Sequence, residues 1–322
     1  MKNKFQIFEI NQTEWNQYWN KLTFNNLNQS FEYGISKSIN NGWTKLNFLI
    51  KSGDHVDLGV VQVLKKRFYL LDIFRINRGP LLFDTNLNDK SRFLNYEVLN
   101  YLKSNITSNI FSLFFVAPEI ENSENFSKFN FFKIRNKISY GSSRINLNVS
   151  EDDLLMNINS KWRNMLRKSE KMPLIIEKQQ VDKDSLDFLL KFYKESQRVN
   201  NFNGIPNPVL RNLANQNSKT YSFDYYISKL TENNQIVGIL VSIRHGKTST
   251  YLIGATNKYG RKFNANYAML WHAILHSKKN GCFWFDLGGI NKNTTDGVKR
   301  FKTRLNGEAY KLIGEYWSFK LL

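Results

Sequence analysis

The order of expected helices and strands occurs twice along this chain, and this repetition limits the possible folds more than any other feature. In the first half, two polar helical stretches around residues 14–21 and 30–40 precede three strand-like runs, a helix and a buried strand. In the second half, a helix, a three-stranded meander, a helix and a strand follow in the same order. The sequence therefore predicts a duplicated α/β architecture.

Local patterns set the limits of these elements. The strand-like runs of the first half are rich in β-branched and aromatic residues and are separated by short turns: residues 46–51, 57–64 and 67–74, with turns at residues 52–54 and at Lys65-Lys66. Apolar residues four apart predict a helix over residues 88–104, and residues 111–116 are expected to form a buried strand. In the second half we expect a helix that begins near Asp184 and then three strands joined as hairpins, at residues 222–230, 235–245 and 248–254. A helix over residues 264–279 and a strand over residues 282–287 are expected to follow.

Size and composition favour two globular domains. The chain has 322 residues, of which 41% are hydrophobic and 15% aromatic, and this is ample for two buried cores. The repeat predicts domains over residues 1–149 and 150–322. Because no Pro/Gly/Ser-rich linker separates them, we expect the two domains to share an interface that forms a substrate cleft.

The net charge of +19 indicates an acidic partner, because such a charge concentrates polyanions near the surface and speeds their capture. A tRNA, a nucleotide-linked sugar, coenzyme A and an anionic membrane surface all fit this requirement. The alternative is that part of the excess charge only keeps the protein soluble.

Cysteine usage and hydropathy indicate the compartment. The single cysteine, Cys282, excludes an internal disulfide and a zinc site built from cysteines, and it fits a reducing compartment. The first residues lack the apolar core of a signal peptide, and the longest apolar run, residues 110–118, is much shorter than the roughly 20 residues that cross a bilayer. We expect a cytoplasmic protein, with any contact to the inner membrane face being peripheral.

The segment KWRNMLRKSEK, residues 161–171, is expected to belong to one amphipathic, cationic helix. Ser150 and Asp153 give a capping-box signal that starts this helix at Glu151. Its buried stripe consists of apolar residues at helical spacing: Leu154, Leu155, Ile158, Trp162 and Leu166. Its other faces carry the positive charges: Lys161, Arg163, Arg167, Lys168 and Lys171. These charges fit the phosphates of a nucleic acid or another anion, and a solvated helix face is the alternative.

The segment WFDLGGI, residues 284–290, ends a buried strand with an acid and two glycines. Asp286 falls where a strand of an α/β sheet reaches its carboxyl edge, which is where ligands usually bind. Gly288 and Gly289 permit a close approach of the backbone to a ligand. The alternative is a tight turn in which Asp286 caps backbone amides.

Together, the basic segment and this C-terminal block, which continues to Phe301-Lys302 and Gly314-Glu315-Tyr316, resemble the Fem family of aminoacyl-tRNA-dependent peptidyltransferases. The resemblance implies an α/β (α+β) fold with two tandem GNAT-like acyltransferase domains, each a mixed, mostly antiparallel sheet flanked by helices. It also implies transfer of an amino acid from aminoacyl-tRNA to an amine of a peptidoglycan precursor during cell-wall biosynthesis. The coiled-coil arm of the family is absent, so we expect the shorter, FemX-like type.

The resemblance implies roles at the reaction centre. In the family a Phe-Lys pair follows the Asp-x-Gly-Gly strand, so Phe301 and Lys302 are expected there. The Lys302 ammonium would stabilise the oxyanion that forms when an amine attacks an ester. Asp286 is expected to shape or polarise the site, and Tyr251 to line the acceptor site. The alternatives are that Lys302 is one more surface lysine and that Tyr251 is a core residue.

The resemblance also implies binding residues. Lys37 resembles the N-terminal lysine that holds the phosphates of the precursor, and Arg198 is expected to assist it. Gly288 and Gly289 are expected to lie against the substrate. Glu315 is expected to contact the substrate as well, with pairing to a nearby arginine as the alternative. The cations of the basic helix are expected to bind tRNA or another anion.

The sequence of one loop indicates which acyl donor the protein uses. Acyl-CoA-dependent GNAT enzymes hold the pyrophosphate of coenzyme A on this loop, at a helix N-terminus. The equivalent stretch, residues 261–266, has asparagine at both glycine positions, so aminoacyl-tRNA is the expected donor and no cofactor is expected. The alternative function is an acyl-CoA-dependent N-acyltransferase that acts on an amino sugar or amino acid of a surface polysaccharide. A third possibility is an RNA- or membrane-surface-binding protein without turnover.

Other chemistries are not favoured by the sequence. His272 and His276 are four apart on a helix but lack the glutamate of a zinc-protease motif, so we expect packing or surface residues and no metal site. The thiol of Cys282, in an apolar strand, is expected to be inert.

Overall fold

The computed structural model describes residues 4–83, 89–106, 111–121, 130–135, 139–292 and 294–321. Contacts divide the chain into two units: unit 1 is Met1–Gly141 with Tyr310–Leu322, and unit 2 is Ser142–Ala309. This division differs from the domain ranges expected from sequence, because the last strand returns to unit 1 and pairs with a strand near residue 115. A pairing over that separation leaves no local sequence pattern.

Unit 1 contains one eight-stranded sheet with the strand order β1-β2-β3-β4-β6-β15-β7, and β5 pairs with β3. Its strands are β1 (Phe5–Glu9), β2 (Thr44–Ser52), β3 (Asp57–Phe68), β4 (Leu71–Asn77), β5 (Leu81–Leu82), β6 (Phe111–Ala117), β7 (Phe132–Lys133) and β15 (Tyr316–Leu321). Its helical segments are α1 (Gln12–Trp19), η1 (Leu27–Gln29), α2 (Phe31–Asn41) and α3 (Asp89–Asn105).

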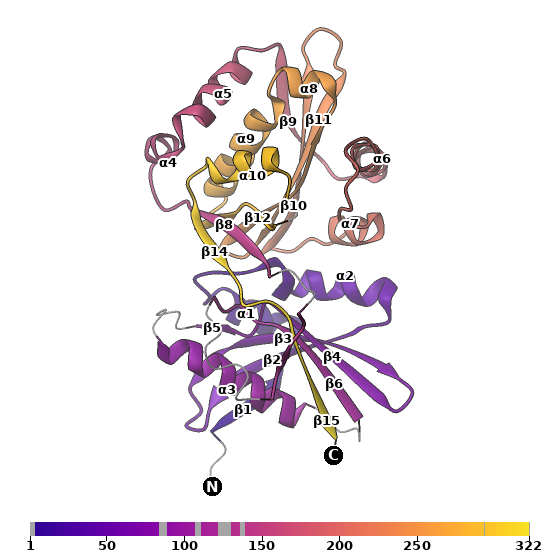
Figure 1. Ribbon diagram of the computed structural model, residues 1–322, viewed down its shortest axis with the longest axis vertical. Coiled ribbons are helices and arrows are strands. Elements are labelled where there is room, and N and C mark those ends of the chain that lie inside the picture. The colour runs from indigo at the N-terminus through magenta and orange to yellow at the C-terminus, as the bar shows by residue number, and fades with distance from the viewer. Residues whose placement is uncertain are drawn as a thin grey trace. The chain divides into compact units, whose positions relative to one another are not determined.

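Helices pack on both faces of this sheet (Figure 1). On one face, Leu99 and Leu102 of α3 pack with Phe74 and Phe114 of the parallel strands β4 and β6. On the other face, α1 and α2 pack against β2 and β3, with Trp15 buried between them and the sheet. The expected first-half helices and strands are confirmed, although residue 88, where a helix start was expected, lies outside the described residues.

The expected turn at Lys65-Lys66 is wrong. β3 continues through these residues to Phe68, and the chain reverses at Tyr69, which has a φ of +53°. Lys65 and Arg67 both pair with the buried carboxylate of Asp72 on β4, at 3.0 and 2.9 Å. These ion pairs keep the polar residues inside the hairpin ladder.

Unit 2 contains a seven-stranded sheet with the order β14-β8-β13-β12-β11-β10-β9. Its strands are β8 (Gly141–Asn146), β9 (Leu174–Gln179), β10 (Tyr221–Leu230), β11 (Ile236–His245), β12 (Thr248–Thr256), β13 (Trp284–Asp286) and β14 (Glu308–Lys311). Its helices are α4 (Glu151–Asn157), α5 (Ser160–Glu170), α6 (Lys183–Asn200), α7 (Asn207–Ala214), α8 (Lys258–Lys262), α9 (Ala265–Lys279) and α10 (Asp296–Thr303).

The predicted duplication is visible in the strand pairing. In each unit, the third strand of an antiparallel meander pairs in parallel with the strand that follows the next long helix: β4 with β6, and β12 with β13. Both sheets are mixed, mostly antiparallel and flanked by helices, which confirms the predicted fold class. Within the described residues, no helix combines the length and apolarity that a membrane crossing requires.

The expected single basic helix is wrong, because the chain forms two helices, α4 and α5. Ser150 caps α4 as predicted, but Ile158 is extended (ψ 142°) and Asn159 caps a second helix by accepting the amide of Lys161. The predicted stripe is still largely buried, because Ile158 points inward at the break. At the break, the Asn159 side chain caps the start of α5, and Arg163 donates to carbonyl oxygens at the end of α4.

Candidate functional site

Lys302, on α10, is buried, with 6% of the residue exposed. Its Nζ donates a hydrogen bond to the carbonyl oxygen of Gly289 at 3.1 Å and lies 5.1 Å from the centre of the Tyr251 ring. The neighbouring Lys299 and Arg300 of the same helix are exposed. The structure therefore excludes the alternative that Lys302 is a surface lysine.

The surroundings of Lys302 change its acidity. Burial lowers the pKa of Lys302 from 10.5 to about 8, and the negative charge of Asp286 opposes this change. Because this pKa is still above 7, most of the population keeps the proton at neutral pH. An ammonium that is already desolvated and held by a carbonyl group is well suited to stabilise a negative charge that forms beside it.

Asp286 is the last residue of β13 and is buried. Its Oδ1 accepts the Gly288 amide at 2.8 Å and the hydroxyl of Ser142 at 2.6 Å. The carboxylate thus caps the glycine turn, as the alternative interpretation expected, and also acts on Lys302 through its charge. Ser142, on β8, gave no sequence signal, because it reaches Asp286 only through the pairing of β8 with β13.

Of the two glycines that follow Leu287, Gly288 is required by the geometry of the turn. Gly288 has a φ of +68°, and a Cβ there would lie 2.5 Å from the Tyr251 carbonyl oxygen. A side chain at this position would meet backbone and would also be strained. Gly289 supplies the carbonyl group that holds Lys302.

Tyr251 lies on β12, one residue beyond the point where the pairing of β12 with β13 ends. The parallel pairing of β12 with β13 ends at Thr250 and Asp286, and a register shift between β11 and β12 follows directly at residue 252. A bulge of this kind re-aims the neighbouring side chain. Burial raises the pKa of Tyr251, and the nearby Tyr193 adds to this, so the phenol keeps its proton.

Phe301 links the two sequence motifs. Its ring lies 6.0 Å from that of Trp162 and 5.0 Å from that of Tyr267, and the Trp162 indole donates a hydrogen bond to the Phe301 carbonyl oxygen at 3.1 Å. The tryptophan of the basic segment therefore fixes the start of the Phe-Lys pair. This contact gives the KWRN segment a structural role next to the expected one in binding.

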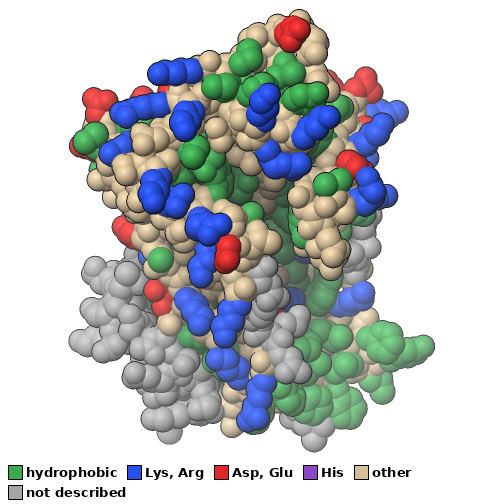
Figure 2. Space-filling view, turned by 45° about the horizontal axis from the view of Figure 1, so that its top comes forward, with side chains coloured by type: hydrophobic (Ala, Val, Ile, Leu, Met, Phe, Trp, Pro, Cys, Tyr) green, Lys and Arg blue, Asp and Glu red, His purple; other side chains and the backbone are tan. Residues whose placement is uncertain are grey.

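The cations of the basic segment divide into two groups. Lys161, Arg167 and Lys168 are exposed on α5, and Figure 2 shows Lys and Arg side chains spread over the upper part of this view, over unit 2. Arg163 is partly buried, and its Nη1 donates to the carbonyl oxygens of Leu155 and Ile158 at the end of α4. Arg163 thus closes the helix break.

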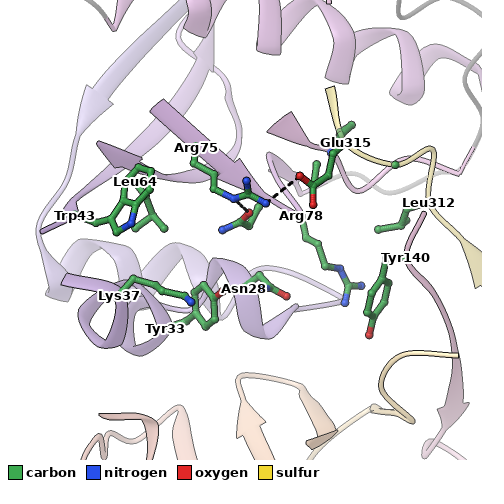
Figure 3. A pocket seen from close by; sticks show the side chains of 14 residues that line it. Asn28, Tyr33, Lys37, Trp43, Leu64, Arg75, Arg78, Tyr140, Leu312 and Glu315 are labelled. Carbon is green, nitrogen blue, oxygen red and sulfur yellow. Dashed lines mark hydrogen bonds and ion pairs between the residues drawn. The ribbon is translucent and has the colours of Figure 1, made fainter. Parts of the chain in front are cut away.

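A cavity of about 520 Å³ lies in unit 1, at the carboxyl ends of the parallel strands β4 and β6 (Figure 3). Lys37 points into it from α2, with its Nζ 5.3 Å from the centre of the Tyr33 ring. Trp43 and Tyr140 also line the cavity. Cations and aromatic rings at the carboxyl edge of parallel strands suit a ligand with an anionic group and a flat ring.

Glu315 lines the same cavity and pairs with Arg75 at 3.2 Å, which is the arginine pairing that the sequence left as an alternative. The sequence did not indicate Arg75 or Arg78. The Arg78 guanidinium is buried and pairs with Glu119 at 2.6 Å; burial acts to lower its pKa, and Glu119 more than reverses this. Arg78 is thus held by the largely buried Glu119, whereas Arg75 pairs with Glu315, which is only partly buried.

Arg198 lies near the end of α6 in unit 2, is exposed, and pairs with Glu195 on the same helix at 2.7 Å. Glu195 lines a second cavity of about 220 Å³ between the end of α6, the end of β12 and α8, which also holds Lys258 and Arg261. The stretch equivalent to the pyrophosphate loop is partly helical here, because Arg261 belongs to α8.

The remaining candidates from the sequence are Cys282 and the histidines of α9. Burial raises the pKa of the Cys282 thiol to about 12, which makes it unreactive at neutral pH. Burial lowers the pKa of His276, whose ring lies 3.9 Å from Asp224. Among the described residues, no group of three or more His, Cys, Asp or Glu is arranged to hold a metal ion.

The duplicated sheets, each with a parallel strand pair after an antiparallel meander, form a tandem GNAT-like architecture. Residues 209–319 match the model of the FemAB family, which confirms the predicted resemblance over this part of the chain. The matched segment contains Tyr251, Asp286 and Lys302.

Solved structures show the same fold. FemX superposes with a TM-score of 0.78 at 15% identity, covering 97% of this chain and 96% of that one. A tandem GNAT protein from the clavulanic acid biosynthesis pathway has a TM-score of 0.53 at 7% identity, covering 98% of each chain. L-PGS from Bacillus licheniformis has a TM-score of 0.52 at 11% identity, covering 96% of this chain and 92% of that one. A search of curated proteins finds no match.

Proposed function

We propose that this protein transfers an amino acid from aminoacyl-tRNA to an amine of an anionic peptidoglycan precursor in the cytoplasm. The observation that carries the proposal is the Lys302 ammonium, buried against the Asp286 glycine turn inside the segment that matches the FemAB family. The fold shared with FemX supports it.

In the proposed reaction, the acceptor amine attacks the carbonyl carbon of the aminoacyl ester. The new C–N bond forms, the C–O bond to the ribose breaks, and a proton passes from the nitrogen to the released ribose hydroxyl. The Lys302 ammonium stabilises the oxyanion between these steps, and the protonated Tyr251 hydroxyl is a second donor for the site. A neutral amine already attacks activated esters, so positioning supplies the rest of the rate.

Unit 1 holds the acceptor in this proposal. Lys37 and Arg75 bind its anionic group in the cavity of unit 1, and the rings of Trp43 and Tyr140 contact the flat part of the ligand. Glu315 gives up its pairing with Arg75 or shifts when the anion enters.

The donor in this proposal is tRNA, bound by the exposed cations of α5, and the reaction needs no cofactor. Helix α8 occupies part of the stretch in which an acyl-CoA enzyme has an open glycine loop, and Asn264 stands before α9 in left-handed geometry. Side chains there reduce the access of a pyrophosphate to backbone amides.

Label transfer tests the proposal directly. The protein is incubated with tRNA charged with a labelled amino acid, or with labelled acetyl-CoA, each beside a panel of soluble and lipid-linked cell-wall precursors. We expect transfer from charged tRNA only. Transfer from acetyl-CoA instead would establish the N-acyltransferase alternative, and salt-sensitive tRNA binding without any transfer would establish a binding protein.

A further inference from the structure

Among the described residues, helices cover only part of the width of one face of the unit 1 sheet. On this face, α1 and α2 contact β2 and β3. The same face continues over the remaining strands, β4, β6, β15 and β7, and the register of the strand pairs shows which side chains lie on it. Phe68 pairs with Leu71, Leu71 with Phe111, and Trp317 with Phe132. The face therefore continues beyond the helices to the edge strand β7.

This part of the face is aromatic and exposed. The tip of the β3–β4 hairpin is its most exposed part, with Phe68, Tyr69 and Leu70 exposed to 60%, 86% and 73%. We call the exposed set the aromatic face: Phe68, Tyr69, Leu70, Phe111, Phe132, Trp317 and Phe319. Figure 2 shows hydrophobic side chains gathered at the lower right, over these strand ends.

The aromatic face is ordered rather than a set of scattered side chains. The rings of Phe111 and Phe319 stack at 6.4 Å across β6 and β15, and those of Phe132 and Trp317 lie 5.3 Å apart across β7 and β15. Phe68 and Tyr69 meet edge to face at 5.0 Å on the hairpin tip. A contiguous exposed apolar patch of this kind marks an interaction site.

The charge around the aromatic face selects the partner. By the same register, Lys66 and Arg75 lie on the aromatic face, and four further cations of these strands lie on the opposite face: Lys65, Arg67, Lys133 and Lys320. Lys65, Lys66 and Arg67 directly precede the exposed hairpin tip. The carboxylates beside them are Asp72 and Glu315, which pair with Lys65, Arg67 and Arg75. The strands that carry the aromatic face are thus net cationic, with three cations against Asp72 next to the hairpin tip. A second copy of this chain, itself at +19, would be repelled.

We propose that the aromatic face docks unit 1 on the surface of an anionic lipid bilayer, with the hairpin tip of Phe68, Tyr69 and Leu70 inserted among the head groups. Aromatic side chains prefer the interface between water and lipid, and nearby Lys and Arg side chains gain from anionic head groups. Binding of this type scales with the apolar area inserted and with the charge of the lipid.

Vesicle flotation tests this proposal without any substrate, so its failure leaves the proposed transfer reaction untouched. The full chain is mixed with vesicles of phosphatidylcholine alone or with phosphatidylglycerol added. A tip variant, Phe68→Ser/Tyr69→Ser/Leu70→Ser, is compared with a control that loses similarly exposed apolar side chains from unit 2, Met156→Ser/Val199→Ser/Val298→Ser. We expect the partition coefficient on anionic vesicles to fall at least 10-fold in the tip variant and less than 2-fold in the control.

A single-site probe covers the case in which the tip variant misfolds. The native Cys282 is buried, so a thiol-reactive fluorophore labels Tyr69→Cys selectively. Its emission should shift to the blue on anionic vesicles, and the same label on Met156→Cys should not respond. Equal binding of tip variant and wild type, or equal binding to neutral and anionic vesicles, would overturn the proposal. A wild-type dimer that dissociates in the tip variant, without vesicle binding, would assign the face to a second copy instead.

Discussion

At the scale of single residues, the buried charge of Lys302 has effects on both rate and stability. Lys302→Met keeps the shape of the side chain and removes the ammonium. We expect kcat for amino acid transfer to fall by about 100-fold or more, the usual effect of losing one group that stabilises an oxyanion. Single-turnover transfer with charged tRNA measures this, with Lys299→Met on the exposed side of α10 as the control. Unchanged turnover would remove Lys302 from the mechanism.

The lowered pKa of Lys302 fixes the sign of two pH effects. As the pH rises through about 8, the ammonium is lost, so the falling limb of the wild-type rate profile lies there and is absent from Lys302→Met. Between pH 8 and the ordinary lysine pKa of 10.5, the unfolded chain binds more protons than the folded chain, so wild-type stability rises with pH in this range.

Below pH 8 the charged lysine is desolvated on folding, and urea unfolding at pH 7 should therefore find Lys302→Met at least as stable as wild type, by up to about 1 to 3 kcal/mol. A variant that loses both activity and stability at pH 7 would show that Lys302 only supports the fold.

At the scale of elements, α5 combines a buried stripe with an exposed cationic face. Replacing its exposed cations, Lys161→Gln/Arg167→Gln/Lys168→Gln, should weaken tRNA binding. The slope of log affinity against log salt concentration should become shallower by about 2 to 3, because binding releases about one counterion fewer for each phosphate contact that is lost. Filter binding over a range of salt concentrations measures the slope. The matched control is Lys183→Gln/Lys191→Gln/Lys194→Gln on α6, which removes the same charge. An equal change in both variants would indicate a general charge effect.

The sequence predicted elements with strong local patterns and missed those that depend on distant pairing. The helix that opens near Asp184 and the meander strands of unit 2 were predictable, because their periodicities are local. In unit 1 the turn expected at Lys65-Lys66 was wrong, because these residues are paired within β3. The break at Ile158 was not, because the apolar stripe continues through it. Ser142 and Arg75 were not found as site residues, because only the pairings of β8 with β13 and of β4 with β6 bring them to their sites.

At the scale of the whole molecule, the proposed reaction assigns acceptor binding to unit 1 and donor binding to unit 2. Steady-state kinetics can separate these two roles. Lys37→Gln in the unit 1 cavity should raise KM for the anionic acceptor by about 10-fold, because it removes one charge-assisted contact, and should leave KM for charged tRNA unchanged. Steady-state transfer with each substrate varied in turn gives both constants. Lys21→Gln, an exposed unit 1 lysine outside this cavity that pairs with Asp57, is the control. A rise in KM for tRNA alone would move the donor to unit 1.

The return of the chain to unit 1 has a consequence for biosynthesis. β15 lies between β6 and β7, and Glu315, directly before it, belongs to the acceptor cavity. While a ribosome is still extending unit 2, the sheet of unit 1 lacks this inner strand and β6 has an open edge. Folding in order from the N-terminus cannot complete the first unit, so the open edge of β6 is a site for aggregation until the whole of unit 2 and then β15 have been synthesised.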